Sequence, residues 1–207
     1  MSDKCRFCNI INKNTKIYEE IDKPIMVGEK YFSLVSIGAF VKGWTLIVSR
    51  EHRYNLCEDY LCQDFFGYLQ EHVARVRKKL NWNSRIIVFE HGANSCDSET
   101  ACGTSHAHLH VLPLEQSILE DITREKSWIK CKWGMVKDVV GEKEYLLYCE
   151  EIDKGMEAEV YIHIVATPES QYFRRVICNK LQLEGSYSYK EDARFEESMQ
   201  TYRILEE

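Results

Sequence analysis

Three of the seven histidines in this chain are spaced two residues apart, in the segment His106-Ala107-His108-Leu109-His110. In an extended strand, successive side chains point to opposite faces, so the three imidazoles share one face. Three imidazoles beside a loop of small residues suit phosphoryl chemistry. One can attack phosphorus, another can donate a proton, and backbone N–H groups can hold anionic oxygens. Two other interpretations stay open: the polar face of an ordinary strand, and a face that binds a metal ion.

A second feature lies near the N-terminus, where Cys5 and Cys8 are separated by two residues. This spacing lets two thiolates bind one tetrahedral ion, which needs two further ligands. The alternative is a pair of buried thiols, since the chain has nine cysteines. An odd number scattered over the whole length fits a reducing compartment better than a disulfide framework.

Composition narrows the class of protein. A chain of 207 residues can bury one good core and carry a compact appendage. Its net charge of −6 argues against a dedicated nucleic-acid-binding protein, because no basic stripe is available to neutralise phosphates. The sequence has no apolar run of about eighteen residues and no hydrophobic signal core at its start. We therefore expect a soluble, cytoplasmic protein with no membrane partner.

The elements that must position these residues follow from hydrophobic patterning. Short runs rich in β-branched and aromatic residues predict four strands, at 31–36, 44–49, 84–90 and 105–112. Between the second and third, apolar residues recur every three or four positions, which predicts one long amphipathic helix over 55–80 with Asn55 as its cap. Strands around a long helix predict an α+β fold.

The second half of the chain has a different pattern. Segments 144–150 and 160–166 predict a hairpin, followed by a helix over 170–181 capped by Ser170 and a last helix containing Phe195 and Leu205. We therefore divide the chain into a first domain, 1–114, which carries the histidines, and a C-terminal α+β extension, 115–207.

Together these features resemble the histidine triad (HIT) nucleotide-binding family, whose signature is His-x-His-x-His followed by apolar residues. The run 45–52, which ends in His52, is similar to the strand and histidine that precede the long helix in that family. The segment from Cys5 to Cys8 is similar to the opening of its zinc-containing members. The resemblance implies a HIT-like antiparallel sheet with one long helix. It also implies a homodimer packed through that helix or an adjoining strand.

The resemblance also implies a structural zinc ion. In the zinc-containing relatives, the remaining ligands correspond to His52 and to the first triad histidine. The implied ligand set is therefore Cys5, Cys8, His52 and His106, a closed set that suits structure rather than activation of water.

Catalytic roles follow by the same resemblance. His108 corresponds to the nucleophile, with its other ring nitrogen held by the backbone carbonyl of His106. His110 would contact the phosphate and help to protonate the departing group. Backbone N–H groups of Gly103, Thr104 and Ser105, with the Ser105 hydroxyl, would hold phosphate oxygens.

The chain departs from the family pattern at three places. Trp44 stands where many members have a histidine after glycine, and Ser36 where many have an aspartate that holds the ribose. Glu90-His91-Gly92 replaces the usual Asn-x-Gly. These departures leave the nucleotide specificity open, although the three histidines of the triad are all present.

The implied function is a nucleotide hydrolase that cleaves a P–O or P–N bond at the α-phosphate of a nucleoside monophosphate conjugate. Such a conjugate is a dinucleoside polyphosphate or a nucleoside phosphoramidate, and the reaction passes through a nucleotidyl-histidine. Hydrolysis is favoured over nucleotidyl transfer because His110 stands where the transferase branch usually carries glutamine. A non-catalytic nucleotide-binding module and a triad that only binds zinc remain alternatives.

Other histidines and arginines are weaker candidates for functional residues. His91 could line the site, whereas we expect His72 and His163 to be structural. Arg174 and Arg175 either clamp a distal phosphate or form a solvated basic face.

Overall fold

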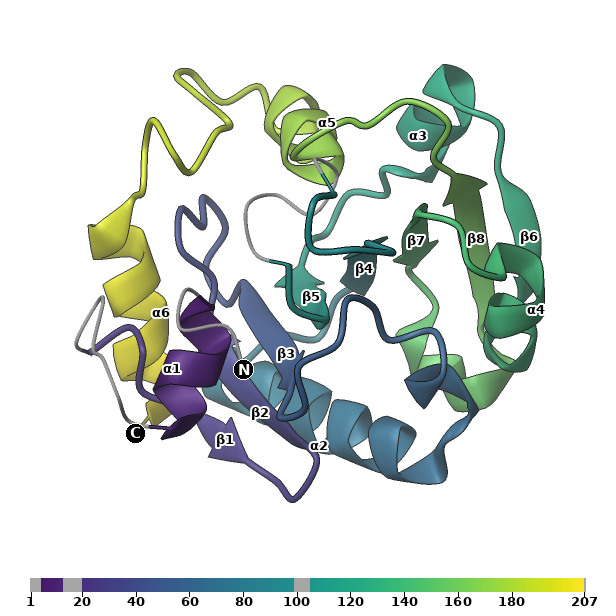
Figure 1. The fold of residues 1–207 in the computed structure, drawn as a ribbon. Coiled ribbons are helices and arrows are strands. Elements are labelled where there is room, and N and C mark those ends of the chain that lie inside the picture. Colours follow the sequence, from purple (N-terminus) through teal and green to yellow (C-terminus); the bar gives the residue numbers. More distant parts are fainter. Residues whose placement is uncertain (1–4, 13–19, 99–104, 207) are drawn as a thin grey trace.

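The computed structural model describes residues 5–12, 20–98 and 105–206. Its centre is one sheet of eight strands in the order β1-β2-β3-β5-β4-β7-β8-β6, and every neighbouring pair is antiparallel (Figure 1). Helices accompany this sheet, so the α+β prediction is confirmed. The strands are β1 (Met26–Val27), β2 (Tyr31–Val35), β3 (Thr45–Ser49), β4 (Ile86–Gly92), β5 (His108–Pro113), β6 (Ile129–Lys132), β7 (Tyr145–Cys149) and β8 (Glu159–Ile164).

The helices differ widely in length. The α-helices are α1 (Arg6–Asn12), α2 (Gln63–Leu80), α3 (Leu119–Glu125), α4 (Val136–Val140), α5 (Tyr172–Lys180) and α6 (Phe195–Glu206). The described residues also form three short 3₁₀ helices, η1 (Asp59–Leu61), η2 (Trp133–Met135) and η3 (Ile152–Glu157). Among the described residues, no helix is both long enough and apolar enough to span a bilayer.

Helix α2 begins later than the sequence pattern predicted, at Gln63 rather than near residue 55. The predicted cap, Asn55, instead orders the preceding loop: its side chain donates to the carbonyl of Ala93 (2.6 Å) and accepts from the N–H of Cys57 (3.2 Å). The helix ends at Leu80, and the next residue, Asn81, caps it in the left-handed conformation at φ 51°. Its apolar residues do recur on one buried face, as expected for an amphipathic helix.

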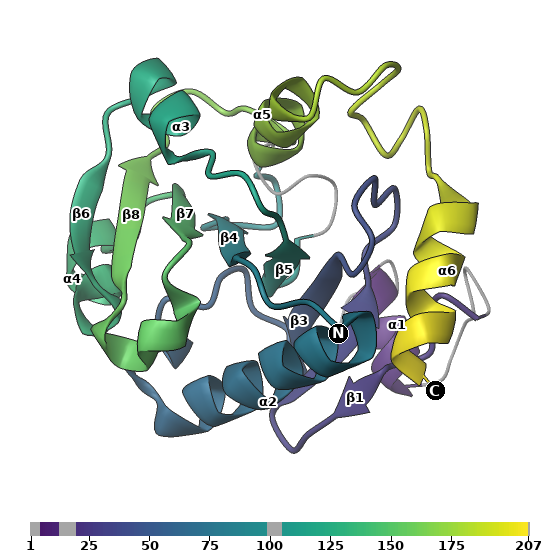
Figure 2. The ribbon, with the colours of Figure 1, turned by 180° about the vertical axis from the view of Figure 1, so that it is seen from behind.

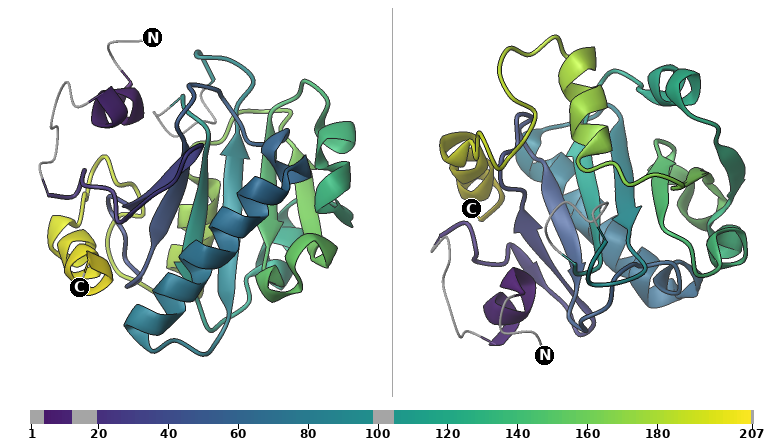
Figure 3. Two further views of the ribbon diagram at one scale, coloured as in Figure 1. Left: turned by 90° about the horizontal axis from the view of Figure 1, so that it is seen from below. Right: turned by 45° about the horizontal axis from the view of Figure 1, so that its top comes forward.

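Helices cover both faces of the sheet, α2 one face and α5 the opposite one (Figures 2 and 3). In strand β5, alternate side chains therefore face different helices. Leu109 and Val111 pack into the core beneath α2, whereas His108 and His110 point to the other face. On that other face, Phe7 of α1 packs over strands β2 and β3, and Phe173 of α5 packs over β4 and β7. The triad histidines therefore lie on the sheet face that carries α1 and α5.

Strands from both halves of the chain belong to the same sheet. The predicted hairpin is present as β7 and β8, with η3 between them, and β7 also pairs with β4. Strand β4 is thus bonded on both edges, and β1 and β6 form the two ends of the sheet. Helix α5 begins at Tyr172, after Gln171 in a left-handed conformation with φ 60°. The predicted cap at Ser170 was therefore wrong. The last predicted helix is α6, which packs beside α2.

Candidate functional site

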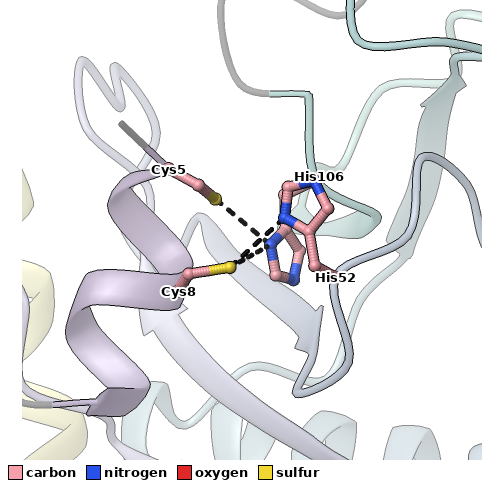
Figure 4. Close-up of side chains that lie close together, drawn as sticks. All are labelled: Cys5, Cys8, His52 and His106. Carbon is pink, nitrogen blue, oxygen red and sulfur yellow. Dashed lines mark hydrogen bonds between the residues drawn. The ribbon is translucent and has the colours of Figure 1, made fainter. Parts of the chain in front are cut away.

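Four side chains that are distant in sequence meet at one point (Figure 4). Cys5 and Cys8 come from the start of α1, His52 follows β3, and His106 precedes β5. The Cys8 sulfur lies 3.2 Å from Nδ1 of His52 and 3.7 Å from Nδ1 of His106, and the Cys5 sulfur lies 3.3 Å from that same His106 nitrogen. All four ligand atoms lie within 4.8 Å of one another.

These separations fit a tetrahedral ion. Zinc bonds of about 2.0–2.3 Å place neighbouring ligand atoms about 3.3–3.8 Å apart. The orientation of His106 agrees, because its Nε2 lies 2.7 Å from the carbonyl of Ser49, which can only accept. Its proton is therefore on Nε2, and the Nδ1 lone pair faces the cysteines. Burial lowers the pKa of His106 to about 4, which keeps the imidazole in the neutral form that binds metals. The set predicted from sequence is thus assembled and could hold a metal ion.

The second histidine of the triad has its predicted backbone partner. Nδ1 of His108 lies 2.7 Å from the carbonyl of His106, so this nitrogen carries the proton and Nε2 keeps a free lone pair. Burial lowers the pKa of His108 to about 4, which keeps the ring neutral near pH 7. Phe7 packs against the ring edge to face, with centroids 5.5 Å apart. A neutral imidazole with one bound nitrogen and one free lone pair is suited to nucleophilic attack.

His110 lies next to His108, with ring centroids 5.0 Å apart. Its ring stacks on Phe89 at 4.4 Å, with an angle of 14° between the planes. Its Nδ1 accepts a hydrogen bond from the indole N–H of Trp44 at 3.0 Å. Burial is the main cause of a pKa well below the ordinary value of 6.5, so His110 is neutral as well.

From the sequence, Trp44 was recognised only as a replaced histidine, and its contact with His110 was not predicted. The signal lay in strand pairing: Leu46 of β3 is opposite His110, and Trp44 is two residues before Leu46 on the same face. A large side chain there reaches diagonally toward His110.

Three other predicted contacts concern the phosphate. Gly103 and Thr104 lie outside the described residues. The hydroxyl of Ser105 donates to the carbonyl of Cys96 at 2.9 Å. The role of these residues in phosphate binding stays a prediction.

Two positions where the chain departs from the family pattern have partners within the fold. Ser36 is buried, and its carbonyl accepts from the hydroxyl of Ser198 on α6 at 2.8 Å. Glu90 points to the α2 side of the sheet, where it accepts from Leu56 N–H and from the hydroxyls of Tyr60 and Tyr145, at 2.5–2.8 Å. The buried Glu90 carboxylate is therefore a structural group within the core.

The two arginines of α5 do not match either predicted role. Arg174 is only 5% exposed, and it donates to the carbonyls of Gly38 and Tyr187. Arg175 forms ion pairs with Glu125 (2.8 Å) and Glu169 (2.9 Å). The predictions of a phosphate clamp and of a solvated basic face were both wrong. The Arg174 guanidinium is buried within the fold, and the Arg175 guanidinium is already paired with carboxylates.

The remaining histidines outside the triad and the Cys-His cluster are His72, His91 and His163. His72 is fully buried and lies 2.7 Å from the hydroxyl of Thr45, and His163 donates from Nδ1 to the carbonyl of Ser127 at 2.9 Å. Both are structural, as predicted. His91 lies on the triad side, 5.3 Å from the ring of Phe173.

Neither a protein-family model nor a curated protein matches this sequence. Three solved structures show partial similarity. A hypothetical histidine triad nucleotide-binding protein from Sulfolobus tokodaii is 20% identical over 55% of this chain and 70% of its own, with a TM-score of 0.38. A HIT family hydrolase from Clostridium thermocellum is 18% identical over 57% and 100%, with a TM-score of 0.42. A Hit-like protein from Bartonella henselae is 15% identical over 57% and 84%, with a TM-score of 0.43. At this level of similarity, function has to be argued from the chain's own residues.

Proposed function

We propose that this protein is a nucleotide hydrolase of the histidine triad type. It cleaves a P–O or P–N bond at the α-phosphate of a nucleoside monophosphate conjugate, through a nucleotidyl intermediate on His108. The observation that supports this most directly is the hydrogen bond between His108 Nδ1 and the His106 carbonyl (2.7 Å), which leaves Nε2 as a free nucleophile. His110, 5.0 Å from His108 between ring centroids, supplies a second imidazole for the phosphate.

The proposed reaction has two displacements. In the first, the lone pair on Nε2 of His108 attacks phosphorus, and the leaving group departs with the electron pair of its bond to phosphorus. The resulting imidazolium keeps its proton on Nδ1, where it is hydrogen-bonded to the carbonyl of His106. In the second, water attacks phosphorus, the P–N electron pair returns to Nε2, and the water loses a proton to solvent. Backbone N–H groups at 103–105 are proposed to hold the phosphate oxygens.

We also propose that Cys5, Cys8, His52 and His106 bind one structural zinc ion. Two thiolates and two imidazoles form a closed ligand set, which is typical of structural zinc. Zinc there supplies no reaction step. It ties the start of α1 to the segment that leads into the catalytic strand β5.

Two further features belong to this proposal. The segment 1–114 carries the chemistry and 115–207 is an extension to it. The protein acts in the cytoplasm as a homodimer. Within the sheet formed by the described residues, β4 is bonded on both edges, and the strands with a free edge for a partner strand are β1 and β6.

The test is turnover by the purified protein of a dinucleoside tetraphosphate and of a nucleoside phosphoramidate. We expect release of the nucleoside monophosphate, and a nucleotidyl adduct on His108 in mass spectra of acid-free, rapidly quenched samples. His108→Ala should lose activity by up to about six orders of magnitude, as loss of a covalent nucleophile does, while monophosphate binding persists. His163→Ala, a structural histidine outside the site, is the matched control.

Each alternative has its own outcome. Monophosphate binding without turnover of either compound would indicate a binding module. An adduct that is stable until a second nucleophile is added would indicate a nucleotidyltransferase. A His108→Ala variant with a tenth of the wild-type rate would exclude His108 as the nucleophile.

A further inference from the structure

The contact between Trp44 and His110 determines where the imidazole carries its proton. The indole nitrogen of tryptophan is a donor only, with no lone pair to accept a hydrogen bond. Its N–H lies 3.0 Å from Nδ1 of His110, so Nδ1 must be the acceptor. The proton of the neutral ring is therefore on Nε2. A histidine at position 44 could donate or accept, but a tryptophan can only donate.

Trp44 is held firmly in this position. Its side chain is fully buried, and its ring lies between aromatic neighbours, with Phe40 at 5.1 Å and Phe89 at 5.9 Å between centroids. The guanidinium carbon of Arg174 lies 4.8 Å from the ring centroid. Because the indole is enclosed by these groups, its N–H stays directed at His110.

This arrangement opposes the charged form of His110. Adding a proton to Nδ1 would place two N–H donors against each other across 3.0 Å. The charged and titratable groups around the ring add to this effect: His108 on the same strand, His91 on β4 and Arg174 on α5 all disfavour a further positive charge. Burial of the ring acts in the same direction.

We propose that Trp44 is a positioning residue that holds His110 as a neutral imidazole with its proton on Nε2, so that His110 donates a hydrogen bond to a phosphoryl oxygen and does not protonate the leaving group. This inference rests on the proposed function. It assigns His110 a different task from the proton donation that the family resemblance implied. A neutral imidazole is a far weaker acid than an imidazolium, so its Nε2 proton is a poor source of a proton for the leaving group.

The chemical class of the substrate follows from this assignment. When a phosphoanhydride P–O bond breaks, the electron pair stays on the leaving phosphate oxygen, which is a stable anion near neutral pH. No proton has to be supplied. When the P–N bond of an alkyl phosphoramidate breaks, the departing nitrogen must be protonated, and a neutral His110 is a poor donor for that proton. The site is therefore built for anhydrides, such as dinucleoside polyphosphates.

The experiment compares two substrates that share one nucleoside monophosphate, a dinucleoside tetraphosphate and an alkyl phosphoramidate, across pH. The wild-type protein should cleave the anhydride faster by about 10²-fold or more, the lower end of what general acid catalysis contributes. The anhydride rate should not depend on a protonated histidine between about pH 5.5 and 8.

The informative variant is Trp44→Phe, which keeps an aromatic ring but removes the N–H. It removes the donor that opposes a proton on Nδ1 of His110, while burial of the ring still lowers the pKa of His110. We expect the preference for the anhydride to narrow by about tenfold or more at low pH, as His110 gains access to general acid catalysis. Trp82→Phe is the matched control, because it removes an indole N–H that bonds to the carbonyl of Arg85, away from the triad. It should leave the preference unchanged.

A second readout does not depend on activity or on the variant folding. Nitrogen chemical shifts of His110 in the ¹⁵N-labelled wild-type protein report its tautomer directly, and we expect protonation at Nε2 alone from about pH 5.5 to 8. An Nδ1-protonated or doubly protonated ring would overturn the inference. Equal cleavage of both substrates by the wild-type protein would overturn it as well. If neither substrate is cleaved while the shifts show the Nε2 tautomer, the proposed function fails and the role of Trp44 in positioning stands.

Discussion

The guanidinium of Arg174 lies over the ring of Trp44, with its central carbon 4.8 Å from the ring centroid. Arg174 belongs to α5, in the second half of the chain, whereas Trp44 directly precedes β3 in the first half. Arg174 also donates to the carbonyl of Gly38 on the first-half side and to that of Tyr187 on its own side. One buried cation thus joins two parts of the chain beside the tryptophan that donates to His110.

Because Arg174 is buried and Arg175 is not, we expect their removal to lower the stability of the protein by different amounts. Arg174→Ala should lower the free energy of unfolding by about 2–4 kcal/mol, because it removes charge-assisted hydrogen bonds and leaves a void. Arg175→Ala should cost about 1 kcal/mol or less, since its ion pairs are partly exposed. Urea unfolding of both variants measures the difference. Equal losses would show that the buried contacts of Arg174 contribute nothing beyond a surface pair.

The proposed zinc ion has a direct test in elemental analysis. We expect one zinc per chain, and a Cys8→Ser protein with less zinc and a much lower midpoint of thermal unfolding. Structural zinc contributes apparent binding free energies of about 10–16 kcal/mol in small domains. The matched control is Cys62→Ser, which changes an exposed thiol outside the cluster. Metal-free protein that unfolds at the same temperature with and without added zinc would contradict the proposal.

The buried carboxyl of Glu90 predicts a pH dependence of stability. Burial raises its pKa to about 7 in the folded protein, above the ordinary value of 4.5. Between these values the folded state binds more protons than the unfolded state. The stabilisation is therefore complete below about pH 4.5 and is lost as the pH rises through about 7. Over this window the change amounts to about 3 kcal/mol.

Urea unfolding at several pH values, compared between wild type and Glu90→Gln, isolates this contribution. The difference in unfolding free energy between the two proteins should change with pH, and should favour the wild type more at pH 5 than at pH 8. Asp153→Asn serves as a control, because that carboxylate is exposed and pairs with Arg77 at the surface. Parallel pH curves for wild type and Glu90→Gln would refute the assigned pKa.

The proposed homodimer is tested by light scattering on the purified protein, which should give twice the mass of one chain. The free edge of β6 carries Lys130 and Lys132, and such charges disfavour strand pairing at an edge. We therefore expect the contact at β1 or at α2 rather than at β6. A mass of one chain at high protein concentration would contradict the dimer.

Local patterns predicted much of this fold, because they depend on neighbours in sequence. Alternation predicted that His108 and His110 share a face, and the spacing of Cys5 and Cys8 predicted that these two thiols lie together in the Cys-His cluster. The start of α2 was misplaced because Asn55 uses its side chain on Ala93, a partner far along the chain.

The other side-chain contacts depend on residues that are far apart in the sequence. The inward turn of Arg174 depends on aromatic rings at Phe40 and Trp44, which no pattern within α5 can reveal. The hydrogen bond from Trp44 to His110 depends likewise on the register between β3 and β5. Six strands were therefore predictable, whereas the short edge strands β1 and β6 and the side-chain partners across the sheet were not.

The central place of β4 has a consequence for synthesis on the ribosome. Both of its partners, β5 and β7, follow it in the chain, and β7 ends only at Cys149. A nascent chain that has emerged as far as Leu114 would present β4 with one edge unpaired and with Phe89 lacking its cover from Phe173. Such an edge can pair with other chains. Release of the first half before the second emerges should therefore produce aggregation, and chaperone engagement should persist until β7 has paired with β4.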